Sequence, residues 1–328
     1  MSDRRLLETI TDSLAANYGI VGSLTRLPGE NLNFLVTETD GTKHVLKIVD
    51  SHMPPAVVQM EHAVMEYAVA AGFKPHLPQI IENKFGNIET PIILHRNGSN
   101  RLRLIEFIDG IEMSRLSDIS FGLLFDLGKT VAEFDVAMEN FEHPAAQRSH
   151  RWNLAEAEQH TDKIRFISDP AKRDLLNWSF SLWRCARGGL ASVPWQFIHG
   201  DAHDENILVQ GERVSGLIDF GDCCRNPTVC EPAICITYLM MRGDDPLRVA
   251  ATILEGYQAV RPLSMDELEL LYPLVCTRLA VSVSVANKRK TIDPHNPNWF
   301  GGEGATWRLL GWLRSLGSEA FGSGLSRC

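Results

Sequence analysis

The 328-residue sequence has no uninterrupted apolar run of about eighteen residues, the length at which a helix can cross a membrane. The start of the chain also lacks the charged and apolar regions of a secretory signal peptide. We therefore expect a protein that neither spans a membrane nor is exported.

The sequence has fewer basic than acidic residues. Lys and Arg total 32 against 41 Asp and Glu, which gives a net charge of -9. Nucleic acids and anionic membranes both select a basic face, so neither is expected as a partner. An acidic surface suits a cationic or zwitterionic small molecule better, although a charge of this size usually serves solubility.

Cysteine is absent from the first half of the chain, and all seven cysteines lie at or after position 185. None forms a C-x-x-C pair, and Cys223 and Cys224 are adjacent, so a disulfide framework and a structural zinc site are both disfavoured. A reducing cytoplasm is the expected compartment.

A phosphate-binding loop of the P-loop type is also missing. Gly128-Lys129-Thr130 matches the end of that motif, but five residues separate Gly128 from Gly122 where the motif needs four. The run is apolar with helical periodicity and no strand precedes it. We predict an ordinary helix there.

The sequence does contain a dense polar segment between Trp195 and Asp222. Short apolar runs at 195–198, 207–209 and 214–218 are separated by a polar stretch and by a turn at 210–212, which predicts strand, loop, strand, turn, strand. Positions 199–206 then fall on a loop, and Asp219-Phe220-Gly221 at a strand end. Polar residues on loops that follow rigid strands are often binding or catalytic residues.

Three side chains of this segment fit phosphoryl transfer. Asp201 can act as the base for an acceptor hydroxyl, a role that this reaction requires. Asn206 and Asp219 carry hard oxygen ligands of the kind that Mg²⁺ prefers. We predict Asp201 as the catalytic residue, and Asn206 and Asp219 as the metal ligands.

The motifs HGDAHDENILV and GLIDFGD, together with RWNL at 151–154, resemble the aminoglycoside phosphotransferase and choline kinase superfamily, and within it the hydroxylysine kinase and type II homoserine kinase branch. The resemblance implies an α+β, protein-kinase-like fold with two lobes. Residues 1–106 would form a small antiparallel-sheet lobe that binds nucleotide, and residues 107–328 a larger, mainly helical lobe that binds substrate. It also implies ATP or GTP as phosphoryl donor and Mg²⁺ as cofactor.

Two other interpretations of the same residues stay open. His199, Asp201 and His203 alternate, so a strand would place them on one face as a zinc site of a hydrolase. Alternatively, the chain is a pseudokinase that binds nucleotide without turnover. For His199 alone, a hydrogen bond to loop backbone is the simpler expectation.

The first lobe is expected to open with a helix, followed by strands. Asp40-Gly41 predicts a two-residue hairpin turn between strands at 33–39 and 42–49. Lys47 lies within the second of these strands, and the resemblance implies that it binds phosphate and pairs with a helix Glu. Glu61 is the first candidate for this partner of Lys47, and Glu66 is the second.

The loop at 28–34 holds one glycine where kinases place a glycine-rich loop, so Asn31 and Asn33 are predicted to contact the nucleotide through their side chains. Further strands are expected near 79–82, 91–95 and 101–108. The segment 104–110 resembles a hinge, in which Glu106 and Ile108 would hold the nucleotide base through backbone groups.

The second lobe is expected to be helical at 121–132, 153–166, 171–187, 232–241, 246–260, 265–286 and 305–316. Glu231 is predicted to brace the loop after Asp219. Acidic side chains near the site would attract an ammonium group, and Arg278 would bind a substrate anion. The substrate candidates are His203, Asp204, Glu205, Asp222 and Arg278, and the acceptor is a small hydroxylated, amino-containing molecule.

Overall fold

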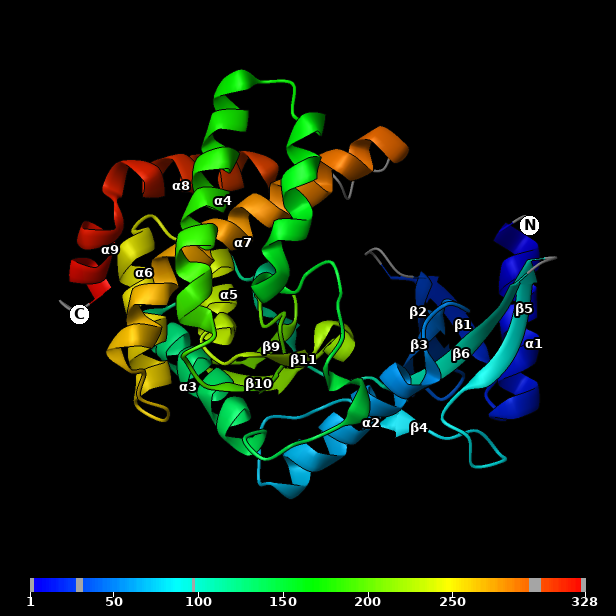
Figure 1. Cartoon of the computed structure of the whole chain (residues 1–328). Helices are drawn as coiled ribbons and strands as arrows, with labels where there is room; N and C mark the ends of the chain where they lie inside the picture. Colours follow the sequence, from blue (N-terminus) through cyan, green and yellow to red (C-terminus); the bar gives the residue numbers. More distant parts are fainter. Residues whose placement is uncertain (1–2, 28–31, 96–97, 295–301, 326–328) are drawn as a thin grey trace. The chain divides into compact units, whose positions relative to one another are not determined.

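The computed structural model describes residues 3–27, 32–95, 98–294 and 302–325 (Figure 1). The chain divides into two compact units. The first consists of Met1–Glu66 and His76–Asp109, and the second of Tyr67–Pro75 and Gly110–Cys328.

The first unit is built on an antiparallel sheet with the strand order β1-β2-β3-β6-β4, in which β5 also pairs with β6. Its six strands are β1 (Gly22–Arg26), β2 (Leu32–Glu38), β3 (Lys43–Val49), β4 (Ile80–Ile81), β5 (Thr90–His95) and β6 (Gly98–Glu106). The small antiparallel-sheet unit expected from the sequence is confirmed.

One face of this sheet forms the core of the unit. Helix α1 (Asp3–Asn17) lies along it, and Ile10 and Leu14 join the same apolar cluster as the inward side chains of the strands (Figure 1). Because side chains alternate between the two faces of a strand, Lys47 and Arg103 point away from that core. The strand residues of the cluster are Phe34, Val36, Leu46, Ile48, Ile92, Leu94, Leu102 and Leu104.

The hairpin between β2 and β3 forms where Asp40-Gly41 predicts it, but its loop has three residues instead of two. Glu38 N donates to Thr42 O at 2.8 Å, and Gly41 N donates to Glu38 O at 3.0 Å. Gly41 has φ 92°, the left-handed conformation that favours glycine after a tight turn.

Helix α2 (Pro55–Ala70) begins at the second proline of Pro54-Pro55, as proline favours at a first helical position. Val57, Met60 and Val64 are buried and form the apolar face of the helix. Glu61 lies on the same helix and is also buried.

The second unit contains two small sheets. One has the order β10-β9-β7, and the other pairs β11 with β8. The strands are β7 (Ile111–Glu112), β8 (Trp195–Ile198), β9 (Ile207–Gln210), β10 (Arg213–Leu217) and β11 (Cys224–Pro227). Strand β8 therefore does not continue the β9–β10 hairpin, because a strand that we did not predict, β11, is its partner.

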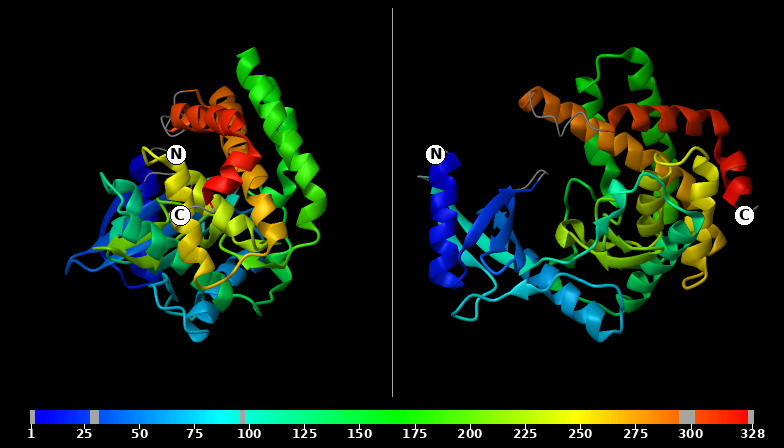
Figure 2. Two further views of the ribbon diagram at one scale, coloured as in Figure 1. Left: turned by 90° about the vertical axis from the view of Figure 1, so that its left-hand side faces the viewer. Right: turned by 180° about the vertical axis from the view of Figure 1, so that it is seen from behind.

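Helices make up most of the second unit, as expected. Figure 2 shows η3 and α4 beside α7, and the last two helices, α8 and α9, beside α7 and α6. The helices are α3 (Phe121–Ala137), η3 (Leu154–Phe166), α4 (Pro170–Leu190), α5 (Cys230–Leu239), α6 (Pro246–Gln258), α7 (Met265–Ile292), α8 (Glu303–Leu316) and α9 (Ser318–Leu325). Short 3₁₀ turns occur at Met113–Arg115, Pro144–Ala146 and Phe220–Asp222.

Helices α3 and α6 touch backbone to backbone at two glycines. A Cβ placed on Gly128 would lie 1.9 Å from Ile253 O, and one on Gly256 would lie 2.0 Å from Phe125 O. The Gly-Lys-Thr triplet thus lies within a helix, as the helical periodicity predicts, and its Gly128 allows close helix packing.

Helix α7 is the one helix of the described chain that is long and apolar enough to cross a membrane. Arg278 interrupts its apolar run, so the helix contains no uninterrupted run of about eighteen apolar residues. The most apolar window of α7 is 83% buried inside the protein, as in the core helix of a globular protein.

Candidate active site

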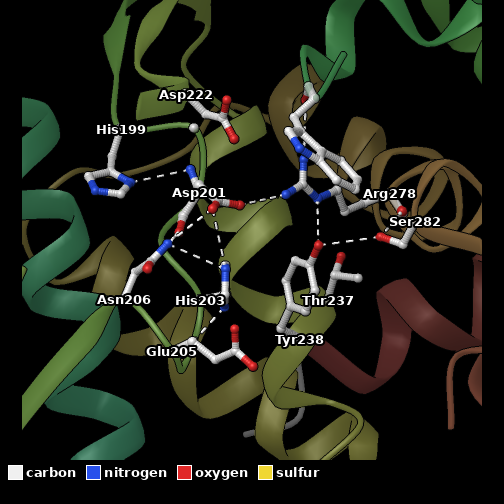
Figure 3. Close-up of polar contacts among 12 residues, drawn as sticks. His199, Asp201, His203, Glu205, Asn206, Asp222, Thr237, Tyr238, Arg278 and Ser282 are labelled. Carbon is white, nitrogen blue, oxygen red and sulfur yellow. Dashed lines mark hydrogen bonds and ion pairs between the residues drawn. The ribbon is translucent and has the colours of Figure 1, made fainter. Parts of the chain in front are cut away.

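The loop between β8 and β9 carries the polar residues expected from the sequence. It turns at Gly200, whose φ is 77° and where an added Cβ would lie 2.8 Å from Asp222 O. Both facts require glycine at this position. The turn directs the next residue, Asp201, into a network of polar side chains (Figure 3).

Asp201 accepts hydrogen bonds from three side chains. Arg278 Nη2 donates to Oδ1 at 2.7 Å, and Asn206 Nδ2 donates to Oδ2 at 3.0 Å. His203 Nε2 lies 3.3 Å from the same Oδ2. The carboxylate is thereby fixed in position, and Oδ1 has one donor where a carboxylate oxygen has room for two.

These contacts set the charges of the site. Burial alone would raise the pKa of Asp201, but His203 and Arg278 outweigh it, and the pKa lies below its usual value. Burial would lower the pKa of His203, but Asp201 and Asp204 raise it well above the usual value. At neutral pH the site therefore holds a carboxylate beside an imidazolium.

Arg278 projects from α7 and is almost completely buried. Its guanidinium carbon lies 5.0 Å from the centre of the Trp152 ring and 5.3 Å from that of Tyr238. Nη1 donates to Trp152 O at 3.1 Å, and Nε donates to Tyr238 Oη at 3.1 Å. The residue expected to bind a substrate anion is thus bound to Asp201 and enclosed by two aromatic rings.

Glu231, at the start of α5, supports the loop between β8 and β9. The prediction that Glu231 braces the loop after Asp219 is wrong: its Oε2 accepts from Gly200 N at 3.0 Å, on the loop before Asp201. A buried carboxylate can satisfy the unpaired N–H groups of a tight turn. Burial raises the pKa of Glu231 to about 7.

His199 is completely buried, with its ring edge-on to Phe134 and Phe220. Its Nε2 lies 3.1 Å from Ile218 O, and its Nδ1 accepts from Asp201 N at 3.3 Å. These backbone contacts agree with the simpler expectation for His199.

The zinc alternative finds no support in the geometry. The loop is not a strand, and His199 contacts backbone while His203 pairs with Asp201 (Figure 3). Within the four described ranges, no group of three His, Cys, Asp or Glu side chains is arranged to hold a metal ion.

Asn206 and Asp219 come together through the backbone. Ile218 N donates to Asn206 O at 3.0 Å, which places the neighbouring Asp219 beside the amide. The contacts of the Asn206 side chain all use Nδ2, so its Oδ1 faces the other way. Asp219 has φ 63°, the one left-handed residue other than glycine in the described chain. Such strain is found at functional sites more often than elsewhere.

The remaining substrate candidates differ in their accessibility. Asp204 is buried and committed to Arg242 Nη1 at 2.6 Å, and its Oδ1 lies 3.7 Å from His203 Nδ1. Glu205 is exposed. Asp222 is partly exposed and lies 3.4 Å from His150 Nδ1.

Two of the nucleotide candidates, Asn33 and Lys47, lie on the face of the sheet opposite α1. Lys47 of β3 stands between Asn33 of β2 and Arg103 of β6 in the strand register. Glu61, predicted as the partner of Lys47, accepts from Arg103 Nη2 at 2.6 Å. Asn31 lies outside the described residues.

Glu106 ends β6, and Ile108 follows within the first unit. The backbone N–H of Glu106 donates to Gln79 O at 2.8 Å, so a hinge contact by this residue would use its carbonyl group. The side chain of Ile108 is buried.

Three residues of these networks, Arg103, Tyr238 and Trp152, were not singled out as site residues. Arg103 and Tyr238 lie on regular elements and meet their partners 42 and 40 residues away in the chain. No local spacing marks such pairs. Trp152 was quoted only as part of the RWNL motif.

The chain is similar to known proteins in sequence and in fold. The sequence pattern of the phosphotransferase enzyme family matches residues 23–268, well over half of the chain. Hydroxylysine kinase from Mus musculus is 29% identical, over 92% of this chain and 86% of that protein. Homoserine kinase from Gluconobacter oxydans is 26% identical, over 84% of this chain and 86% of that protein.

Among solved structures, amicoumacin kinase in complex with AMP-PNP, Ca²⁺ and Ami superimposes with a TM-score of 0.72 at 14% identity, over 97% of this chain and 94% of that chain. This likeness confirms the kinase-like α+β fold. The relatives are named as kinases, and the match to the family extends through the Asp201 loop and Asp219. The chain therefore belongs to the phosphotransferase enzyme family.

Proposed function

We propose that this small-molecule phosphotransferase moves the terminal phosphoryl group of ATP or GTP to a hydroxyl of a small amino-containing substrate. The observation that carries the proposal is the fixed, ionised carboxylate of Asp201, held by Arg278, His203 and Asn206. A positioned base of this kind contributes about 10²- to 10⁴-fold to the rate.

In the proposed reaction the acceptor oxygen forms a bond to the terminal phosphorus while the bond from that phosphorus to the nucleoside diphosphate breaks. The proton of the acceptor hydroxyl passes to the carboxylate of Asp201. The low pKa of Asp201 makes it a weak base, which suits a loose transition state in which the proton moves late. Positioning of the hydroxyl is then the main contribution of this residue.

The residues present fit a divalent metal ion. Asn206 Oδ1 and the Asp219 carboxylate are oxygen donors on adjoining segments, as Mg²⁺ prefers. When bound there, Mg²⁺ would offset negative charge on the phosphates. The left-handed backbone of Asp219 sets the direction of its carboxylate.

For the nucleotide we assign residues 1–106 as the binding lobe and residues 107–328 as the catalytic and substrate lobe. Lys47 and Glu61 would act on the phosphates, with Asn33 and Asn31 near them. Glu106 and Ile108 would hold the base through backbone groups. The register that aligns Asn33 with Lys47 supports this assignment.

For the acceptor we favour a hydroxylated amino acid similar to hydroxylysine or homoserine, because relatives bear these names. An amino alcohol and an aminoglycoside are the further candidates. Glu205 and Asp222 keep exposed carboxylate surface near Asp201 and could attract an ammonium group. His203, Asp204 and Arg278 would act on the substrate indirectly, since each is committed to another side chain. We place the enzyme in the cytoplasm.

The test is release of nucleoside diphosphate in the presence of Mg²⁺ and ATP or GTP. The acceptors are hydroxylysine, homoserine, ethanolamine, choline and an aminoglycoside, with Asp201→Asn as the blank. We expect acceptor-dependent release that the variant loses, while nucleotide binding and thermal stability of the variant match the wild type. Retention of most activity by Asp201→Asn would refute the assigned base. Magnesium-dependent nucleotide binding without consumption of any nucleotide would instead identify a pseudokinase.

A further inference from the structure

A row of three polar side chains crosses the sheet of the first unit. Asn33, Lys47 and Arg103 are register partners on the adjacent strands β2, β3 and β6. Directly opposed residues on neighbouring strands point to the same face and are about 5 Å apart at Cβ. That face is the one opposite α1, so the row lies away from the apolar cluster.

Arg103 is the most deeply buried cation of the row, with 5% of its surface exposed. Nη2 donates to Glu61 Oε2 at 2.6 Å, whereas Nε and Nη1 are buried and have no hydrogen-bond partner among the described residues. Buried polar groups are paired in most proteins, and donors left without an acceptor are costly. An acceptor that approaches this face would relieve that cost.

Arg101, two residues earlier on β6, is an arginine whose donors are paired in the usual way. Its Nε donates to Glu89 Oε1 at 2.8 Å, and its Nη2 donates to Met53 O at 2.6 Å. Two arginines on one face of one strand therefore differ: Arg101 is held at both ends of its guanidinium, and Arg103 is held at one.

The chemistry of Arg103 indicates what kind of acceptor would fit. Its side chain is a cation with two buried donors, Nε and Nη1, that have no acceptor among the described residues. A guanidinium with free donors in a planar fork matches the oxygens of a phosphate group. An anionic ligand with several oxygens therefore fits Arg103 better than a neutral ligand.

We propose that Arg103 is a second cationic ligand for the phosphate chain of the nucleotide, beside Lys47. The inference rests on the proposed function, since it needs a nucleotide substrate. The alternative is that Arg103 only holds α2 to the sheet through Glu61. In that case replacement of either Arg103 or Glu61 would disturb the packing of α2 on the sheet to a similar extent.

The experiment measures binding of five probes by calorimetry in EDTA: ATP, GTP, their nucleosides adenosine and guanosine, and inorganic tripolyphosphate. The proteins are the wild type, Arg103→Gln, Arg103→Lys, Glu61→Gln and the matched control Arg101→Gln. Thermal unfolding reports whether each variant folds.

We expect Arg103→Gln to weaken binding of triphosphates and tripolyphosphate by about 10- to 100-fold, as for loss of a hydrogen bond to a charged group. Binding of the nucleosides is expected to stay within about twofold. Arg103→Lys should recover part of the loss, because it restores the charge but not the fork. Arg101→Gln should bind triphosphates as the wild type does.

Glu61→Gln separates the two roles. In Glu61→Gln the side-chain oxygen can still accept from Arg103, so a phosphate-ligand role of Arg103 predicts a smaller loss of triphosphate binding than in Arg103→Gln. If the pair only holds α2 to the sheet, Arg103→Gln and Glu61→Gln should lose affinity to the same extent, for nucleosides and for triphosphates. Parallel losses in the two variants, or unchanged triphosphate binding in Arg103→Gln, would overturn the inference about Arg103. If the wild-type protein still binds triphosphates in that case, the proposed function stands. A wild-type protein that binds no triphosphate would overturn both.

Discussion

Arg278 donates from Nη2 to Oδ1 of Asp201 at 2.7 Å, although the two residues are 77 positions apart in the chain. The side chain of Arg278 is 1% exposed and that of Asp201 is 18% exposed. The aromatic rings of Trp152 and Tyr238 enclose the guanidinium. We therefore propose that Arg278 positions Asp201, the proposed base, and does not itself bind a substrate anion.

Replacing Arg278 with Gln should lower both stability and turnover. Removal of one partner from a buried ion pair leaves the other charge uncompensated, which typically costs about 3–5 kcal/mol. We expect kcat to fall by about 10²-fold or more because Asp201 loses its orientation. Urea unfolding and steady-state kinetics measure the two effects. Arg314→Gln, at an exposed ion pair with Asp174, is the control and should cost no more than about 1 kcal/mol. Wild-type stability and turnover in Arg278→Gln would contradict the role.

Asp219 permits a test that separates backbone strain from metal binding. Asn tolerates the left-handed conformation better than most residues, so Asp219→Asn should unfold within about 1 kcal/mol of the wild type. Its activity should nevertheless fall by about 10²-fold, and half-saturation should need more Mg²⁺, because an amide is a weaker ligand than a carboxylate. Asp219→Ala should lose stability as well as activity. If Asp219→Asn keeps its activity and its Mg²⁺ dependence, the carboxylate is not a ligand.

Glu231 should make stability fall as pH rises between about 4.5 and 7. Its folded pKa is raised to about 7, so the folded state binds the proton more tightly than the unfolded state does. The favourable contribution is complete below the unfolded value of about 4.5 and is lost as pH passes through the folded value. The neighbouring Asp135, also buried with a raised pKa, acts in the same direction.

We therefore expect Glu231→Gln to flatten the pH dependence of the free energy of unfolding by an amount of the order of 1–3 kcal/mol. Gln keeps an oxygen that can accept from Gly200 N, so the loop contact is preserved. Urea unfolding at pH 5, 6, 7 and 8 gives the comparison. Glu269→Gln on the exposed side of α7 is the control. Parallel curves for wild type and Glu231→Gln would show that this carboxyl does not titrate as proposed.

Gly128→Ala should destabilise the second unit. The new Cβ would lie 1.9 Å from Ile253 O, so the backbones of α3 and α6 must separate. Overpacking of this kind typically costs about 1–3 kcal/mol, which exceeds the gain of up to about 1 kcal/mol from helix propensity. Gly311→Ala in α8, where the added Cβ meets nothing within 4 Å, should instead be neutral or stabilising. Equal thermal stability of the two variants would argue against the close contact.

The sequence predicts local structure well where one short pattern decides it. Strand β8 has the bounds expected from its apolar run, and α2 begins at its proline. The loop that carries Asp201 and Asn206 follows from the breaks on either side of it. In the hairpin, Asp40-Gly41 marks the turn but not its length, because the left-handed glycine also fits a three-residue loop.

Features that depend on distant segments were missed. Strand β11 forms only because β8 offers it an edge, and nothing in Cys224–Pro227 itself indicates a strand. Glu231 was placed against the wrong segment for the same reason, since its partner Gly200 lies 31 residues away. The pairing of Glu61 with Arg103 requires the strand order of the sheet, which periodicity does not give.

Helix α7 has a consequence for biosynthesis. The loop with Asp201 is made well before residue 278, which supplies its counter-charge from α7. Proteins are synthesised from the N-terminus, so a nascent chain holds the Asp201 carboxylate for some time without its guanidinium partner. The sheet and the α1 core of the first unit contain no residue of α7. The ion pair between Asp201 and Arg278 can therefore form only late in translation, after α7 has been synthesised.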